Sequence, residues 1–148
     1  CKKRMEELKT TGKYTLDVKA KDIVGQWADE AKTAAAIRTM FEENGYVLDT
    51  HTAVAYASYE TYKKETGDAT PTLIVSTASP YKFTKDVMTA IDEKYAQEDF
   101  FVLMDKMAAL SGVAIPAPIR GIQDRPVRHK TVIEKDNNKA FVADYLTK

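Results

Sequence analysis

Residues 71–83 read PTLIVSTASPYKF, and this stretch decides the fold class that the sequence predicts. The apolar run before Ser76 does not alternate with polar residues, which is typical of a central β-strand covered on both faces. Thr77 follows Ser76. Two residues further on, Ser79 and Pro80 are of types that commonly begin a helix, as the cap and the first helical residue. A buried strand that leads into a helix predicts an α/β fold, with helices around a few strands.

Helices and two further strands are expected on either side of this central strand. An acidic cap at Asp29 and another at Asp99 precede helical apolar stripes, and Gly45 follows the first of these at the position of a left-handed C-cap. Trp27 is the only tryptophan, and we expect it to be a buried packing anchor. The expected helices cover residues 1–10, 30–44, 51–66, 83–91, 99–111 and 138–146, and the weaker strands cover 13–19 and 129–135.

The composition indicates a single domain with no global charge to attract a polyanion. The chain has 148 residues, and its 22 basic and 22 acidic side chains give a formal net charge of zero. This balance does not favour nucleic acid or an anionic membrane as a partner. No apolar run approaches the roughly 18 residues that a membrane span requires. Cys1 is the only cysteine, which favours a reducing, cytoplasmic setting.

The start of the chain suggests that it is part of a larger protein. The sequence starts at Cys1, not at a methionine, with a segment that already reads as helix, so we expect residues 1–148 to be a piece of a longer polypeptide. Residues 113–148 form a proline-containing tail that is expected to wrap over the body. The basic residues of the tail have acidic neighbours, which argues against a nucleic-acid patch.

Two polar stretches are the candidate sites. In an open α/β sheet, ligands bind beyond the carboxyl ends of the strands, where Ser76 and Thr77 are expected. Ser79 is expected to cap the following helix while Thr77 faces a ligand, although both could be parts of a cap and nothing more. In the second stretch, residues 48–58, either Asp49 or Thr50 caps a helix, and His51 reads as a structural histidine in its first turn, satisfied by backbone groups.

Several common site motifs are absent from the sequence. There is no HxxxH, HExxH or CxxC spacing for a metal ion, and no GxSxG nucleophile elbow. Neither a GxxxxGKS loop nor a GxGxxG loop is present, so the sequence does not indicate nucleotide binding.

The order of four segments resembles the threonine synthase family. Residues 49–55 (DTHTAVA) and 76–83 (STASPYKF) resemble two C-terminal signatures whose usual forms are close to DPHTAVG and TAHPAKF. Residues 27–49 resemble the segment just before the first signature, and residues 116–135 resemble the C-terminal end of some members. The departures from the family pattern are Thr50 for proline, Ala55 for glycine and Ser79 for histidine.

The resemblance implies a pyridoxal 5'-phosphate enzyme of fold type II, a lyase that converts O-phospho-L-homoserine and water to L-threonine and phosphate. Thr77 matches the family's hydroxyl residue that meets the pyridine nitrogen of the cofactor. The Schiff-base lysine and the glycine-rich phosphate loop belong to the N-terminal half of the family's proteins. The resemblance therefore implies that residues 1–148 are a single C-terminal fragment of a larger catalytic domain. We expect the lysine and the phosphate loop to come from the remainder of the same polypeptide, and expect this chain alone to be inactive.

Two other readings of the sequence are open at this stage. The chain could belong to another fold-type II enzyme, such as a dehydratase or a tryptophan synthase β-like protein. It could also be a non-catalytic α/β interaction domain in which Thr77 and Ser79 only cap a helix. The pairing of DTHTA with STASPYKF favours threonine synthase.

Overall fold

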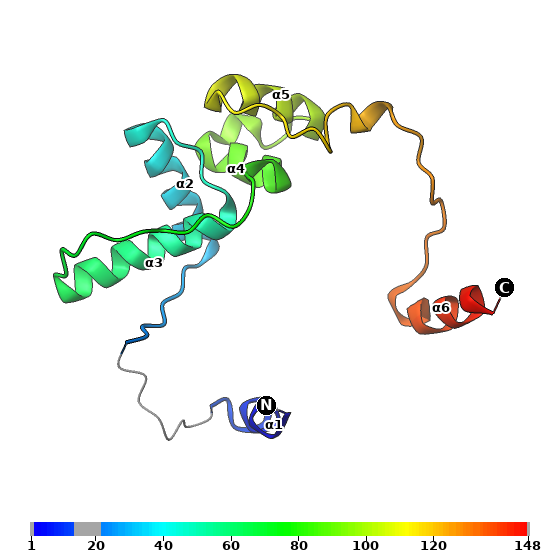
Figure 1. Cartoon of the computed structure of the whole chain (residues 1–148), viewed down its shortest axis with the longest axis horizontal. Helices are drawn as coiled ribbons and strands as arrows, with labels where there is room; N and C mark the ends of the chain where they lie inside the picture. The colour runs from blue at the N-terminus through cyan, green and yellow to red at the C-terminus, as the bar shows by residue number, and fades with distance from the viewer. Residues whose placement is uncertain (1, 14–21, 148) are drawn as a thin grey trace.

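The fold is a small body of packed helices with an extra helix toward each end of the chain (Figure 1). The computed structural model describes residues 2–13 and 22–147. The α-helices are α1 (Lys2–Thr11), α2 (Glu30–Asn44), α3 (Thr50–Thr66), α4 (Thr84–Ile91), α5 (Phe100–Ser111) and α6 (Asn138–Leu146). The short 3-10 helices are η1 (Pro80–Phe83), η2 (Glu93–Tyr95), η3 (Ile122–Asp124) and η4 (Lys135–Asn137).

Local capping explains where the central helices begin and end. The Asp29 carboxylate accepts a hydrogen bond from the Lys32 backbone N–H at 2.8 Å, which satisfies a donor that the first turn of α2 leaves unpaired. Gly45 ends α2 with φ 65°, a left-handed conformation that costs glycine little. Asp49 and Asp99 cap α3 and α5 in the same way. The predicted bounds 30–44 are therefore confirmed, and those of 51–66 are confirmed to within one residue.

The predicted α/β fold is wrong, because no strand forms among residues 2–13 and 22–147. Residues 71–77 are extended, but Leu73 is 87% exposed and Val75 is 68% exposed. An apolar run becomes a strand only when a neighbouring backbone pairs with its N–H and C=O groups. Residues 129–135 form no strand either, and the strand predicted for 13–19 lies mostly outside the described residues.

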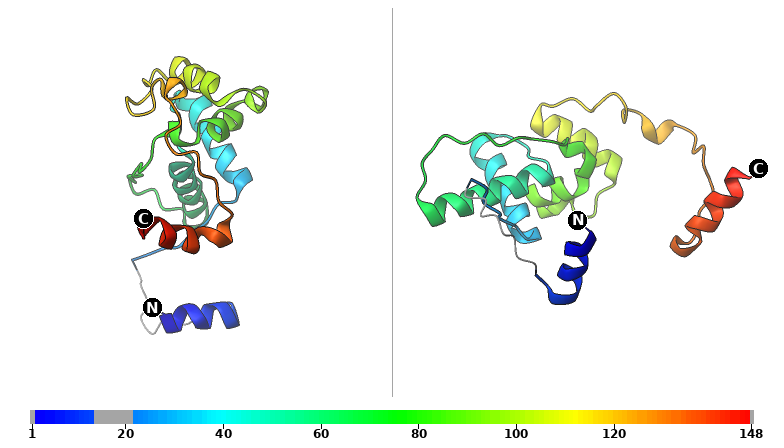
Figure 2. Two further views of the ribbon diagram at one scale, coloured as in Figure 1. Left: turned by 90° about the vertical axis from the view of Figure 1, so that its right-hand side faces the viewer. Right: turned by 60° about the horizontal axis from the view of Figure 1, so that its bottom comes forward.

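The core lies where α2, α3, α4 and α5 meet. α2 packs against α3 and α4, and α4 packs in turn against α5, as two further views show (Figure 2). The side chains at the centre of this core are almost fully buried, and they include Ile37, Ala53, Val87, Met88, Leu103 and Met107. The candidate site lies at the beginning of α3, where His51 contacts Phe83, the last residue of η1.

Trp27 does not belong to this core, so the expectation of a buried anchor is wrong. Its side chain is 70% exposed, and the Lys32 ammonium lies 5.1 Å from the centre of its ring. The segment before α2 runs over the surface without regular structure, so its only large aromatic ring has no core to enter.

The body ends near Gly121, and the described residues after it are exposed. Ile115 and Ile119 still pack against the core, and the Tyr81 hydroxyl donates a hydrogen bond to the Val113 carbonyl at 2.5 Å. Every described residue from 122 to 147 is exposed, and Figure 1 shows α6 at the end of an extended segment, apart from the body. Within the part of the chain that the structure describes, no helix is both long and apolar enough to cross a membrane.

Candidate functional site

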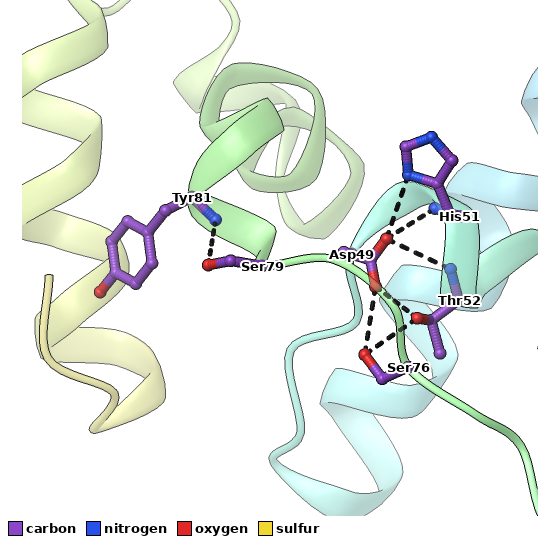
Figure 3. Close-up of polar contacts among 6 residues, drawn as sticks. All are labelled: Asp49, His51, Thr52, Ser76, Ser79 and Tyr81. Carbon is purple, nitrogen blue, oxygen red and sulfur yellow. Dashed lines mark hydrogen bonds and ion pairs between the residues drawn. The ribbon is translucent and has the colours of Figure 1, made fainter. Parts of the chain in front are cut away.

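Asp49 is the centre of the polar cluster at the beginning of α3 (Figure 3). Its side chain is completely buried. One carboxylate oxygen, Oδ1, accepts hydrogen bonds from the backbone N–H of His51 at 2.9 Å and of Thr52 at 3.3 Å. Of the two caps that the sequence left open, Asp49 or Thr50, the structure therefore selects Asp49.

The second oxygen of Asp49 connects α3 to the extended segment that follows it in the chain. Oδ2 accepts hydrogen bonds from the Thr52 hydroxyl and from the Ser76 hydroxyl, the latter at 3.4 Å. The Thr52 and Ser76 oxygens are themselves 3.1 Å apart. A single carboxylate thus joins the two polar stretches that the sequence showed 27 residues apart.

His51 extends this cluster to the surface. Its Nδ1 lies 3.3 Å from Asp49 Oδ1, and its side chain is 56% exposed. The imidazole ring also contacts Phe83, with ring centres 5.3 Å apart and planes tilted by 54°. The expectation of a histidine satisfied by backbone groups is wrong, because the partner of its ring is a side-chain carboxylate.

The hydrogen bonds keep the Asp49 carboxyl ionised. Burial raises the pKa of Asp49, but the hydrogen bonds from the Thr52 hydroxyl, the two backbone N–H groups and His51 together outweigh burial and lower that pKa below its usual value. An ionised carboxylate only accepts hydrogen bonds, so we assign a proton to His51 Nδ1 and leave Nε2 free toward solvent.

Ser79 begins the helical segment after the extended stretch. Its hydroxyl accepts a hydrogen bond from the Tyr81 backbone N–H at 3.3 Å, and Pro80 is the first residue of η1. The predicted cap at Ser79, with Pro80 as the first helical residue, is confirmed. The Tyr81 ring is buried beneath this turn and fixes it to the body.

Thr77 lies between the Asp49 cluster and the cap at Ser79. It is exposed, and no hydrogen bond involves its hydroxyl among the residues that the structure describes. Ser76, by contrast, is engaged with Asp49 and Thr52. Thr77 therefore retains its full capacity to bind an atom that this chain does not supply, and its role in cofactor binding stays a prediction.

Sequence reasoning missed the bridge between Asp49 and Ser76. It treated residues 49–55 and 76–83 as the beginnings of two separate helices, each with its own cap. It gave Asp49 only the role of a possible cap for the first of these helices. The available signal was the hydroxyl at Ser76, which is not required for the cap that Ser79 makes.

Across the described ranges 2–13 and 22–147, no three His, Cys, Asp or Glu side chains gather closely enough to hold a metal ion.

The fold and the site define a helical domain whose polar side chains gather where two capped helical segments begin. Residues 52–142 match the protein family described as "Threonine synthase, C-terminal". This match covers more than half of the chain, and the chain belongs to that family.

Curated relatives support the same assignment. The chain is 31% identical over 123 residues to "Threonine synthase-like 1" of Mus musculus, an alignment that covers 83% of this chain and 15% of the mouse protein. It is 32% identical over 102 residues to "Threonine synthase" of Schizosaccharomyces pombe, covering 65% of this chain and 20% of that protein. The chain thus spans a fifth or less of these relatives.

The polar groups that the structure describes can be compared with the pyridoxal phosphate that the resemblance implies. The Asp49 carboxylate is buried, and its two oxygens are already occupied by backbone and side-chain donors, so it is not available to a pyridine nitrogen. The neighbouring free group is the neutral hydroxyl of Thr77. A hydroxyl of this kind is chemically able to donate a hydrogen bond to a pyridine nitrogen.

Proposed function

We propose that this chain is the C-terminal part of a threonine synthase, which converts O-phospho-L-homoserine and water to L-threonine and phosphate with pyridoxal phosphate. The observation that carries the proposal is the family match over residues 52–142. The matched region includes Ser76, Thr77 and Ser79, the residues around the free hydroxyl.

In this proposal the chain contributes one side of the cofactor site. When bound, pyridoxal phosphate supplies an electron sink for carbanion chemistry. Thr77 would hold the pyridine nitrogen with a neutral hydroxyl, which stabilises a protonated ring far less than a carboxylate does. A neutral partner would make the ring a more moderate electron sink and would thereby limit side reactions of the bound amino acid.

The remaining parts of the site come from elsewhere in the same polypeptide. No lysine of this chain lies in a context that resembles the family's cofactor-binding lysine, and the chain has no glycine-rich loop for the cofactor phosphate. We expect residues 1–148 alone to release no phosphate from O-phospho-L-homoserine.

The test is a product assay on the full-length protein that contains this chain. The protein is purified with pyridoxal phosphate and supplied with O-phospho-L-homoserine, and phosphate and threonine are both measured. Equal amounts of the two products are expected. If neither product forms, the proposal is wrong.

Two parallel assays distinguish the other functions. Release of a keto acid and ammonia from serine or threonine, with no phosphate from the phosphorylated substrate, would indicate a dehydratase. Purification without any cofactor absorbance would indicate an interaction domain.

A further inference from the structure

Ser76 joins the extended segment that leads to Thr77 to the beginning of α3. Its hydroxyl oxygen lies 3.4 Å from Asp49 Oδ2 and 3.1 Å from the hydroxyl oxygen of Thr52. In the described structure, no other hydrogen bond joins residues 71–77 to a helix. The course of the backbone just before Thr77 therefore depends on the polar contacts of one side chain.

Apolar packing adds little to this attachment. Leu73 and Val75, which precede Ser76 in the same segment, are 87% and 68% exposed. The next attachment along the chain is Ser79, whose hydroxyl caps η1. Figure 3 shows both attached serines, one beside α3 and one at the beginning of η1. Thr77 thus lies in a short link that is fixed at both ends by serine hydroxyls.

The hydroxyl protons distinguish Ser76 from Thr77 as possible ligands. A serine or threonine hydroxyl has one proton to donate, and an ionised carboxylate can only accept. Ser76 donates its proton to Asp49 Oδ2, so it has none left for an acceptor outside this cluster. The Thr77 hydroxyl makes no hydrogen bond among the described residues and keeps its proton. The two adjacent hydroxyls are therefore suited to different tasks, attachment for Ser76 and ligand contact for Thr77.

We propose that Ser76 is a positioning residue, which Asp49 and Thr52 hold in place so that the neighbouring Thr77 hydroxyl meets the pyridine nitrogen of pyridoxal phosphate. This inference rests on the proposed function, which assigns Thr77 to the cofactor. Ser76 itself touches neither the cofactor nor the substrate. It restricts the link before the cofactor binds, and less conformational freedom is then lost on binding.

The affinity of the full-length apoenzyme for pyridoxal phosphate, measured without substrate, tests the inference. Ser76→Ala removes the attachment and should raise the dissociation constant of the cofactor by about 2- to 10-fold, which is the range for the one neutral hydrogen bond that Thr77 makes. Ser76→Thr keeps the hydroxyl on a residue that suits extended backbone, so it should bind the cofactor as the wild type does. Ser76→Cys, a weaker donor, should give an intermediate constant.

The matched control is Thr72→Ala, which removes a hydroxyl from the same extended segment. The Thr72 hydroxyl donates to the nearby Thr70 carbonyl at 3.0 Å and does not reach α3. This variant should keep the wild-type dissociation constant. An increase equal to that of Ser76→Ala would show that any loss of a hydroxyl from this segment has the same effect, and would overturn the inference.

A double-mutant cycle with Thr77→Val separates positioning from a general effect on folding. If Ser76 acts through Thr77, Ser76→Ala should change the dissociation constant by less than about 2-fold once Thr77→Val is present. Effects of the two changes that simply multiply would overturn the inference. Melting temperatures of the four apoenzymes accompany the cycle, because a merely structural role of Ser76 would lower stability and affinity alike in both backgrounds.

The outcomes for this inference and for the proposed function are distinct. A wild type that binds pyridoxal phosphate, with a Ser76→Ala variant that binds it equally well, overturns the inference alone. A wild type that binds the cofactor but forms neither threonine nor phosphate overturns the proposed function, while the dissociation constants still decide the role of Ser76. A full-length protein with no affinity for the cofactor overturns both.

Discussion

At the scale of single residues, Asp49 has the largest number of contacts in the site. It caps α3, orients His51 and holds Ser76. Its residue type and position were sufficient to predict a cap, since aspartate before an apolar helical stripe satisfies free N–H groups. The bridge to Ser76 depends on how residues 67–75 return along α3, and no local pattern encodes that path.

The ionised form of Asp49 should make stability depend on pH. The pKa of Asp49 in the folded chain lies below its value of 3.8 in the unfolded chain. The contribution to stability is therefore present above pH 3.8 and is lost as the pH falls through the folded pKa. Asp49→Asn keeps a good cap but removes the charge, and it should cost about 1–3 kcal/mol at neutral pH.

Thermal melts of the wild type and of Asp49→Asn, recorded from neutral pH down to below 3.8, test this expectation. The difference between the two proteins should shrink as the solution becomes acidic. A difference that stays constant with pH would show that the carboxylate charge contributes nothing.

Thr77→Val should weaken the holoenzyme without weakening the fold. The hydroxyl is exposed and makes no hydrogen bond within the described residues, so its loss leaves the body intact. Loss of one neutral hydrogen bond to the cofactor ring, roughly 0.5–1.5 kcal/mol, should reduce kcat/KM by about 2- to 10-fold. Turnover and cofactor absorbance of the full-length enzyme are the measurements, and Thr77→Ser is the control that should retain both. Equal activity of Thr77→Val and wild type would remove Thr77 from the cofactor site.

At the scale of the elements, the sequence predicts helices much better than strands. A helix satisfies its hydrogen bonds within itself, so Asp29 and Gly45 are enough to place both ends of α2. A strand requires a partner from elsewhere in the chain. Residues 71–77 have the composition of a buried strand but no paired neighbour in the described structure, and composition alone cannot supply one.

Leu103→Ala should destabilise the body, because α5 packs against α4 and Leu103 is a buried residue of the core. Leu103 is fully buried in the core, and deleting its side chain should cost about 2–5 kcal/mol. Val102 is the adjacent, exposed residue of the same helix, and Val102→Ala should change stability by less than about 0.5 kcal/mol. Urea unfolding of the two variants gives the comparison. Similar losses from both would contradict the packing of α5 described above.

Leu73→Lys should be tolerated in this chain. The side chain is 87% exposed, so an added charge remains in water and should change the free energy of unfolding by less than about 0.5 kcal/mol. The measurement is urea unfolding of the 148-residue chain, with Leu103→Ala as the destabilised reference. A loss as large as that of the reference would mean that residues 71–77 are covered, as the sequence predicted.

At the scale of the whole molecule, the packed body and the tail differ in what stabilises them. The body has a continuous core from α2 to α5, and that core reaches Ile115 and Ile119. The described residues beyond Gly121 are exposed, and α6 buries none of its side chains. A helix of nine residues with no buried face is marginal in water, because few hydrogen bonds offset the cost of nucleation. Within this chain the tail therefore has little to contribute to the stability of the body.

Truncation after Gly121 tests this division. Because residues 122–147 cover no core side chain, the shortened chain should melt within about 2 °C of the 148-residue chain, and its urea midpoint should be unchanged. A control truncation after Gly112 also removes Ile115, Ile119 and the Val113 carbonyl that accepts from Tyr81, so it should lower the melting temperature clearly. If the cut after Gly121 is as destabilising as the cut after Gly112, the tail packs on the body of this chain, as the sequence predicted. If the cut after Gly121 leaves the stability of this chain unchanged but lowers that of the full-length protein, the surface that the tail covers belongs to the remainder of the polypeptide.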